Sequence, residues 1–515
     1  MFAFALYDEN TCRLVLARDP FGIKPLFLFQ HNGGLAFGSE LKAVAPCLGA
    51  SPRVDPTALV ASLMYYWVPE SHCVYRDVEK LPAGCWAEMS PNQTLRVHRY
   101  WDLGDEVAAQ ASRTVDAAEV GQVIEDSVSA HMVADVPVSM FLSGGLDSSL
   151  ITVMAAKQTS NLECYTISFR EEDRRLEAMP DDLTYARKIA ERHGIKLHTI
   201  EIAPDVTELL PRMVRILDEP IGDAAAINAF LICKAARDAG TKVLLSGMGA
   251  DEIFGGYRRH YACLLAARYR RLPQILRKSV ISPLVGCLPV AGKNTGYRTI
   301  RWAKRFLSFA DLPEEAAYRR SYTHYGHEEF QGLLNPDLMT AVGELFEEHA
   351  EIYGSGPAEN RIDRMCHTDI RHFLPGLNLA YTDRASMAAS TEVRVPYVDK
   401  DVVAASLATK GNQKIEGHVS KAILKKAAKA WLPREIIYRP KGVFSAPLRA
   451  WIRRDLRDMV EDQLMRGKLV GSGFLNSKYI RRMVDDDRNG EADMSKEIWQ
   501  LLTLETWMQH HSHSI

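Results

Sequence analysis

A turn rich in glycine and serine is the first group of residues in this sequence that could do chemistry. Ser143-Gly-Gly-Leu-Asp-Ser-Ser149 follows the apolar run 136–142 and precedes a helical pattern. Glycine lets a backbone approach a phosphate closely, and the N–H groups at a helix start favour an anion. The hydroxyls of Ser143, Ser148 and Ser149 add donors. The string predicts a phosphate-binding loop, but neither a Walker-type loop nor a dinucleotide fingerprint. The simpler alternative is an ordinary helix cap after a glycine turn.

Asp147 is the unexpected member of this loop, because a carboxylate beside a phosphate repels it. A Mg²⁺ ion between the two would remove that conflict. A second acidic turn, within 244–257, supplies Asp251 after another apolar run. Because the carboxyl ends of parallel strands meet at one edge of a sheet, we expect both carboxylates to bind one Mg²⁺. Ser246 and Gly247 would then face the nucleotide, although a capped helix is again the alternative.

The elements around these turns alternate between strand and helix patterns. Apolar strand-like runs are followed by helical ones, at 136–142, 163–169, 196–202 and 242–245 for the strands and 148–158, 183–193, 206–217 and 227–238 for the helices. This rhythm predicts an α/β domain with a doubly wound parallel sheet that helices cover on both faces. From about residue 256 onward the pattern is mostly helical.

Residues 1–105 have a different pattern of short strand-like runs separated by turns. His31-Asn-Gly-Gly34 is a strong hairpin signal. We expect a small antiparallel sheet there, and a polar linker at 105–113. The sequence therefore predicts two domains, at 1–105 and 114–515.

Composition narrows the class of protein. The 515 residues include 63 Lys and Arg against 65 Asp and Glu, a net charge of −2 that favours neither nucleic acid nor an anionic membrane. None of the nine Cys forms a Cys-x-x-Cys pair, which argues against a disulfide scaffold or zinc ribbon. The longest later apolar run, Ile281–Val290, is interrupted by two prolines and too short to span a bilayer. We expect a soluble, cytoplasmic protein without a membrane partner; a homodimer stays open.

Several strings resemble known families. The loop 143–149 resembles the pyrophosphate-binding loop of the N-type ATP pyrophosphatases, which have an adenine nucleotide alpha hydrolase-like fold. Four later segments resemble, in order, the asparagine synthetase (glutamine-hydrolysing) family: Asp218-Glu-Pro-Ile-Gly-Asp223, Asp383-Arg-Ala-Ser-Met387, Glu392-Val-Arg-Val-Pro-Tyr-Val-Asp399 and Arg439-Pro-Lys-Gly-Val-Phe-Ser-Ala-Pro447. The strings Ala17-Arg-Asp-Pro-Phe-Gly-Ile-Lys-Pro-Leu26 and Gly38-Ser-Glu-Leu41 resemble the second half of a class II glutamine amidotransferase domain, an Ntn-type α+β domain. Taken alone, Asp383, Arg384, Glu392 and Arg394 also fit a structural ion network.

The resemblance implies an ATP-dependent, amide-forming ligase of asparagine biosynthesis. A substrate carboxylate, aspartate in the family, would attack the α-phosphorus of ATP and release pyrophosphate. Ammonia from glutamine would then convert the acyl-AMP into an amide and AMP. Adenylation is needed because a free carboxylate has no good leaving group. ATP and Mg²⁺ are the implied ligands.

The resemblance also assigns roles to individual residues. Pyrophosphate and its Mg²⁺ would be held by one set, Ser143, Gly144, Gly145, Asp147 and Ser148, with Asp251 completing the metal site. Phe141 and Ile167 match positions that bound the adenosine pocket, and Ser246 and Gly247 match nucleotide contacts. Lys441 matches a lysine that stabilises charge at the α-phosphate, although alone it would be taken for part of a solvated basic turn.

Two positions depart from the family pattern. Position 2 is Phe, where the family glutaminase has its nucleophilic Cys after the initiator Met, and the family's glutamine-binding residues would precede Met1. We therefore expect glutaminase activity to be lost, and the chain to be poorly soluble or dependent on a partner with the missing half. Met248 stands where asparagine-forming members have Glu. Because Met cannot accept a proton, another carboxylate, such as a sugar uronate or a peptide acid, is an alternative acceptor.

Two further functions remain as alternatives. The first is tRNA modification, because thiolation enzymes share the Ser-Gly-Gly-x-Asp-Ser loop and Arg268–Lys278 with Lys293–Arg305 is basic. A solvated helix face explains these charges more simply, so we do not expect nucleic acid. The second is a catalytically dead regulatory homologue, which would bind nucleotide without releasing pyrophosphate.

Overall fold

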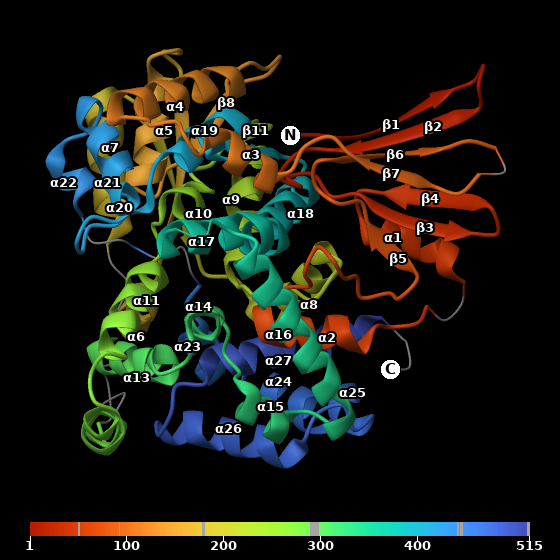
Figure 1. Ribbon diagram of the computed structural model, residues 1–515, viewed down its shortest axis with the longest axis vertical. Helices are drawn as coiled ribbons and strands as arrows, with labels where there is room; N and C mark the ends of the chain where they lie inside the picture. Colours follow the sequence, from red (N-terminus) through yellow and green to blue (C-terminus); the bar gives the residue numbers. More distant parts are fainter. Residues whose placement is uncertain are drawn as a thin grey trace.

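The computed structural model describes residues 1–49, 52–91, 93–177, 181–288, 298–357, 359–439, 442 and 446–511. Figure 1 shows the antiparallel strands of the N-terminal segment on one side of a larger body made mostly of helices. The central sheet and its helices lie within this body, at its upper part in this view.

A five-stranded parallel sheet forms the framework of the larger body. Its strand order is β10-β9-β8-β11-β12, and every neighbouring pair is parallel. The strands are β8 (Val138–Phe141), β9 (Glu163–Phe169), β10 (Lys196–Ile202), β11 (Val243–Leu245) and β12 (Glu392–Arg394). The predicted parallel sheet is confirmed. The sequence did not reveal the edge strand β12, because its three residues alternate between charged and apolar side chains.

Helices cover both faces of this sheet, as predicted. One core includes Met140, Cys164 and Leu245 and packs against α4 (Ala117–His131), α5 (Leu146–Ala156) and α7 (Asp182–His193). The other includes Tyr165, Leu244 and Val393 and packs against α8 (Val206–Leu217), α9 (Ala225–Asp238) and α18 (Ala380–Ala388). Successive strand residues alternate between the two cores, so the chain has a doubly wound α/β architecture.

The N-terminal segment forms two antiparallel sheets, where the sequence suggested one. The first sheet has the order β1-β2-β6-β7, and the second has the order β4-β3-β5. Their strands are β1 (Ala3–Asp8), β2 (Arg13–Arg18), β3 (Phe27–His31), β4 (Gly34–Gly38), β5 (Val78–Lys80), β6 (Cys85–Met89) and β7 (Arg96–Arg99). The hairpin at residues 31–34 joins β3 to β4 as predicted.

A helix that the sequence analysis missed, α2 (Pro56–Tyr65), packs within the helical body against α16 (Met339–Gly354) and α27 (Ser495–His510). Asp55 caps its start by accepting a hydrogen bond from the Thr57 amide. Every residue from Ala58 to Tyr65 is buried, and these residues belong to the same core as α8 and α9. A helix that is apolar on all sides gives no helical periodicity, so the pattern could not identify it.

The remaining helices pack around the sheet and extend below it (Figure 1). They are α1 (Leu41–Val44), α3 (Leu103–Gln110), α6 (Glu171–Glu177), α10 (Ala250–Phe254), α11 (Arg258–Tyr269), α12 (Ser282–Gly286), α13 (Arg298–Ala310), α14 (Glu314–Tyr322), α15 (His327–Leu333), α16 (Met339–Gly354), α17 (Arg361–Thr368), α19 (Lys400–Ala408), α20 (Gly411–Lys414), α21 (Ala422–Ala427), α22 (Arg434–Ile437), α23 (Leu448–Ala450), α24 (Arg457–Met459), α25 (Lys468–Gly471), α26 (Ser477–Asn489) and α27 (Ser495–His510). The expected linker at 105–113 is thus largely helix α3.

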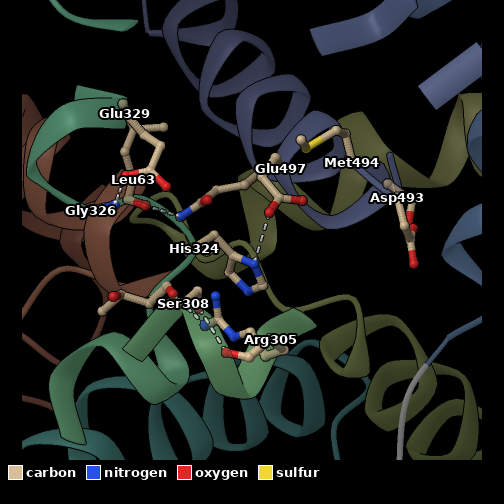
Figure 2. A network of polar contacts seen from close by, with 12 residues as sticks. Leu63, Arg305, Ser308, His324, Gly326, Glu329, Asp493, Met494 and Glu497 are labelled. Carbon is tan, nitrogen blue, oxygen red and sulfur yellow. Dashed lines mark hydrogen bonds and ion pairs between the residues drawn. The ribbon is translucent and has the colours of Figure 1, made fainter. Parts of the chain in front are cut away.

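Helix α27 is fastened to α2 and to the loop before α15 by a buried polar network (Figure 2). His324 Nδ1 lies 3.1 Å from Glu497 Oε1, and burial lowers the pKa of His324 to about 4. Gln500 donates to the carbonyls of Ser62 and Leu63, both at 2.6 Å. These bonds satisfy polar groups that would otherwise be buried without partners, and they fix α27 against the N-terminal segment.

Ion pairs join the antiparallel strands to the parallel-sheet body. Lys80 Nζ lies 2.8 Å from Glu219 Oε2, with both side chains almost fully buried. Lys24 pairs with Asp383 at 2.6 Å, and Arg384 lies within 4.0 Å of Glu219. All four residues that also fitted a structural ion network do form ion pairs: Asp383 pairs across this contact, Arg384 lies beside Glu219 within the body, and Glu392 pairs with Arg394.

Removing the buried cation of this contact should destabilise the protein. Lys80→Met would remove the nearest cation of the buried Glu219 and leave only Arg384 at 4.0 Å among its described cationic partners, which should cost about 3 kcal/mol. Urea unfolding followed by tryptophan fluorescence should show a clearly lower midpoint. Arg53→Met, in an exposed pair with Asp77, is the matched control and should change stability by less than about 1 kcal/mol. Equal midpoints for the two variants would contradict the assigned role of Lys80.

Candidate functional site

The phosphate-binding loop predicted from the sequence lies at the carboxyl end of β8. Gly144 has φ +68°, and a Cβ atom there would lie 2.4 Å from the backbone nitrogen of Ala186. Only glycine therefore fits this turn. The Ser143 hydroxyl lies 3.0 Å from that of Ser148 and accepts from the Gly145 amide at 3.4 Å. The loop is thus ordered by its own hydroxyls.

The start of α5 lacks the Asp or Ser cap that the simpler alternative required. Gly145 is the N-cap residue, and no side chain among the described residues caps this end of the helix. The alternative of an ordinary Asp or Ser cap is therefore not what the structure shows. Uncapped N–H groups at a helix start carry partial positive charge and are a ready site for a phosphate.

The second predicted turn follows β11 and touches the first. A Cβ atom on Gly247 would lie 2.8 Å from the backbone nitrogen of Ser148, so the two turns are in direct contact. Gly249, with φ +93°, then redirects the chain into α10. The Ser246 hydroxyl accepts from the Met248 amide at 3.3 Å. The parallel arrangement of β8 and β11 therefore brings the two acidic turns together, as expected.

Asp147 and Asp251 meet at one buried lysine, Lys421. Its Nζ atom lies 2.6 Å from Asp147 Oδ2 and 2.7 Å from Asp251 Oδ1. Burial alone would lower the pKa of Lys421, but the two carboxylates outweigh that effect and raise it. A Cβ atom on Gly256 would lie 1.9 Å from Lys421 Cε and 2.1 Å from Asp251 Oδ1. Glycine at this position makes room for the lysine and the carboxylate.

The donor set fits a Mg²⁺ that arrives with a nucleotide. No group of three or more His, Cys, Asp or Glu side chains among the described residues could hold a metal ion unaided. Mg²⁺ commonly uses one or two carboxylates and takes its other ligands from substrate phosphates and water. Asp147 and Asp251 match that requirement. They are the residues that would hold the ion.

Lys421 is the main site residue that sequence analysis missed. It lies far along the chain from both carboxylates, and its neighbours Lys425 and Lys426 are typical of a solvated helix. In the structure Lys421 has a positive φ of 52° just before α21, which turns its side chain into the site. Nothing in the local sequence indicates that conformation.

The remaining predicted residues lie near the same edge, except for one outside the described residues. Phe141, opposite Tyr165 in the sheet, and Ile167 are half-buried and pack against the same core. Lys441 falls outside the described residues. From the same motif, Arg439 donates to the Gly144 carbonyl at 2.8 Å and pairs with Asp182. The motif therefore contacts the phosphate-binding loop.

Two side chains beside Asp251 bear on the choice of acceptor. Met248 Sδ accepts a hydrogen bond from the Thr382 hydroxyl at 3.6 Å. Glu252 accepts from the Tyr257 hydroxyl at 2.6 Å and from the Asn378 amide at 2.5 Å. Burial, with a smaller contribution from Asp251, raises the pKa of Glu252 to about 7. Its carboxylate is thus engaged by protein donors and does not replace a Glu at 248.

Comparison with known proteins places this chain. Residues 119–509 match the family model described as asparagine synthase. This chain belongs to the asparagine synthase family. Residues 1–101 match the model described as a glutamine amidotransferase domain. The family supports an ATP-dependent ligase that forms carbon–nitrogen bonds, and the doubly wound sheet agrees with the predicted fold.

Relatives of this asparagine synthase family member match nearly the whole chain in sequence. A Mycobacterium tuberculosis protein, described as a candidate asparagine synthetase (glutamine-hydrolyzing), is 32% identical over 98% of this chain and 76% of its own. Asparagine synthetase (glutamine-hydrolyzing) 1 of Bacillus subtilis is 29% identical over 98% of this chain and 77% of its own. Amidase chry2 of Gibberella zeae is 25% identical over 96% of this chain and 76% of its own.

Lys421 should stabilise the folded protein by neutralising two carboxylates. Lys421→Met should lower stability by about 3 kcal/mol, because two like charges would then share a partly buried site. Since folding raises the pKa of this lysine, its stabilising effect is complete below its ordinary value of about 10.4 and is lost as pH rises through the higher folded value. The melting temperatures of the unmodified protein and of Lys421→Met, measured between about pH 6 and 11, should therefore approach each other only at the alkaline end of this range.

The matched control for this experiment is Lys426→Met. Lys426 lies one turn of α21 away and forms an exposed ion pair with Glu416. Its loss should change the melting temperature very little at any pH. A Lys421→Met protein as stable as this control at neutral pH would contradict the role assigned to Lys421.

Proposed function

We propose that this protein activates a substrate carboxylate with ATP and converts it into an amide, releasing AMP and pyrophosphate. The observation that supports the proposal most directly is the meeting of Asp147 and Asp251 at Lys421, beside a glycine-lined loop and an uncapped helix start. Such a site concentrates donors and cations where a triphosphate would lose its two terminal phosphates.

The site residues divide the work of the first step between them. The N–H groups at the start of α5 and the hydroxyls of Ser143 and Ser148 would bind the β- and γ-phosphates. A carboxylate oxygen attacks the α-phosphorus while the bond from that phosphorus to the bridging oxygen breaks. Lys421 would neutralise charge on the departing pyrophosphate, and Lys441 is proposed to act at the α-phosphate. Mg²⁺, held by Asp147 and Asp251, would supply further positive charge.

The second step forms the amide. Ammonia attacks the acyl carbon of the adenylate, a proton leaves the nitrogen, and AMP departs with the electron pair of the carbon–oxygen bond. Phe141 and Ile167 are proposed to bound the adenosine through this step, which would keep the reacting carbon in place. Among the described residues, Glu252 is not assigned as the base that takes this proton, because its carboxylate accepts hydrogen bonds from Tyr257 and Asn378.

Aspartate is the acceptor that the family favours, giving asparagine. A different carboxylate is the second candidate, and two observations support it. Met248, bonded to Thr382, offers no proton acceptor at a position where asparagine-forming members have Glu. One relative over most of the chain is named an amidase rather than an asparagine synthetase.

We also propose that these 515 residues use ammonia and do not hydrolyse glutamine. A thiol nucleophile needs a lowered pKa or a nearby base. Burial instead raises the pKa of six of the nine cysteines, namely Cys73, Cys85, Cys164, Cys233, Cys263 and Cys366. The other three, Cys12, Cys47 and Cys287, are exposed, and none has a hydrogen bond to a histidine among the described residues.

The reaction class can be tested by its products. The protein is incubated with ATP, Mg²⁺, ammonium and either aspartate or another carboxylic acid. We expect AMP and pyrophosphate to form in equal amounts, measured by mass spectrometry and a coupled pyrophosphate assay. Asp147→Asn should lower turnover by about 10²-fold or more, whereas Asp135→Asn, at an exposed position before β8, should not. Nucleotide binding without pyrophosphate release for every acid would instead indicate a regulatory homologue.

The nitrogen source can be tested on the same protein. Ammonium should support amide formation. With glutamine, the rate of amide formation should not exceed the rate measured without any nitrogen donor, because six of the nine thiols are buried with raised pKa values and the other three have no hydrogen bond to a histidine among the described residues. Release of glutamate is measured directly by mass spectrometry, with ¹⁵N-ammonium as the positive control. Glutamate formation that depends on this chain would overturn this part of the proposal.

A further inference from the structure

One segment of the chain is strongly basic although the whole is nearly neutral. From Arg258 to Ala310 the sequence has twelve Lys and Arg residues and no Asp or Glu. Several of these cations serve the fold: Arg277 pairs with Asp311, and Arg305 donates to the Thr323 carbonyl. Others, including Arg268, Arg271 and Lys278, are exposed. The local excess of positive charge is therefore presented to solvent.

The same segment exposes an apolar ridge. We use this name for six residues, Leu272, Ile275, Leu276, Val280, Leu284 and Leu288, whose side chains are between 39% and 78% exposed. Ile275 and Leu284 are the most exposed of them, at 78% and 65%. Single exposed apolar residues are common on protein surfaces, but a contiguous row of large aliphatic side chains usually marks a contact site.

The ridge lies on a helical stretch that is attached along one side. Residues Leu276–Ile281 form a π-helical segment that continues into α12, and α12 packs against α13. Arg277, Ile281 and Val285, spaced by four, are half-buried. Four ridge residues have the same spacing of four but are exposed: Leu276, Val280, Leu284 and Leu288. The apolar row therefore runs along the helix on the side that the fold leaves uncovered.

An exposed aromatic side chain lies on α13, the helix that packs against α12. Trp302 of α13 is 43% exposed and stacks on Phe306 at 5.6 Å between ring centroids. Tryptophan is favoured at the boundary between apolar and aqueous phases, because its ring is apolar and its N–H is polar.

We propose that the apolar ridge and the exposed cations around it dock this enzyme on an anionic phospholipid surface. The helical stretch is too short to cross a bilayer, so the contact would be peripheral, with the aliphatic side chains entering the headgroup boundary and the cations facing lipid phosphates. The net charge of −2 concealed this local asymmetry, and the sequence analysis therefore expected no membrane partner. Single-stranded RNA is a poorer fit, because nucleic-acid sites stack successive bases on aromatic side chains, whereas all six residues of the ridge are aliphatic.

The proposal is tested by vesicle co-sedimentation of the full chain. Vesicles of phosphatidylcholine with phosphatidylglycerol should retain the protein, vesicles of phosphatidylcholine alone should retain much less, and added salt should weaken binding. Ile275→Ser with Leu284→Ser should weaken retention about tenfold or more, because each exposed aliphatic side chain contributes through burial in the lipid. Their melting temperature should stay unchanged, since both side chains are largely solvated.

Two controls separate this proposal from other occupants of the ridge. Val133→Ser removes an apolar side chain that is 76% exposed on a different surface, before β8, and should leave vesicle binding unaltered. Light scattering during size exclusion measures whether the ridge mediates self-association. The proposal would be overturned by equal binding to neutral and anionic vesicles, or by no binding to either. It would also be overturned if Ile275→Ser with Leu284→Ser dissociated an oligomer, or if tRNA displaced the protein from vesicles and the same two substitutions abolished tRNA binding.

Discussion

The site depends on one ammonium group placed between two carboxylates. Asp147 and Asp251 belong to different strand ends, and each would repel the other if they met without a cation. Lys421 offsets that repulsion, because its Nζ atom lies 2.6 Å from Asp147 Oδ2 and 2.7 Å from Asp251 Oδ1. Burial of the lysine strengthens its attraction to both carboxylates. Because the lysine neutralises the pair before any ligand arrives, the two acidic turns can pack against each other. The parallel pairing of β8 and β11 brings Gly247 against Ser148, and the lysine removes the charge repulsion that this contact would otherwise carry.

Glycine positions make the same arrangement sterically feasible. At Gly144 a side chain would collide with α7, and at Gly256 it would take the space of the lysine itself. The polar and the steric requirements therefore fall on different residues of the same turns. Substitution at either kind of position would separate the carboxylates, one by repulsion and the other by displacement.

Local rules predicted the fold around the site well and the contributions of distant segments poorly. The βα rhythm and the two turns identified the parallel sheet and the pairing of Asp147 with Asp251, because both follow from strand direction alone. Lys421 could not be found in this way, since its role depends on a positive φ and on α21 reaching the strand ends. Helix α2 was missed for the opposite reason, because burial on all sides removes the periodicity on which the prediction relies.

The position of α2 has a consequence for how the polypeptide can be divided. This helix belongs in sequence to the antiparallel N-terminal segment, but its side chains fill the core that also contains α8 and α27. A fragment containing the synthetase portion alone would lack α2, and the apolar side chains that α2 covers would be exposed to water. Such a fragment would have to collapse, aggregate or recruit a substitute helix. The two segments that are consecutive in the chain thus share one hydrophobic core. The N-terminal segment and the synthetase portion should therefore unfold as one cooperative unit.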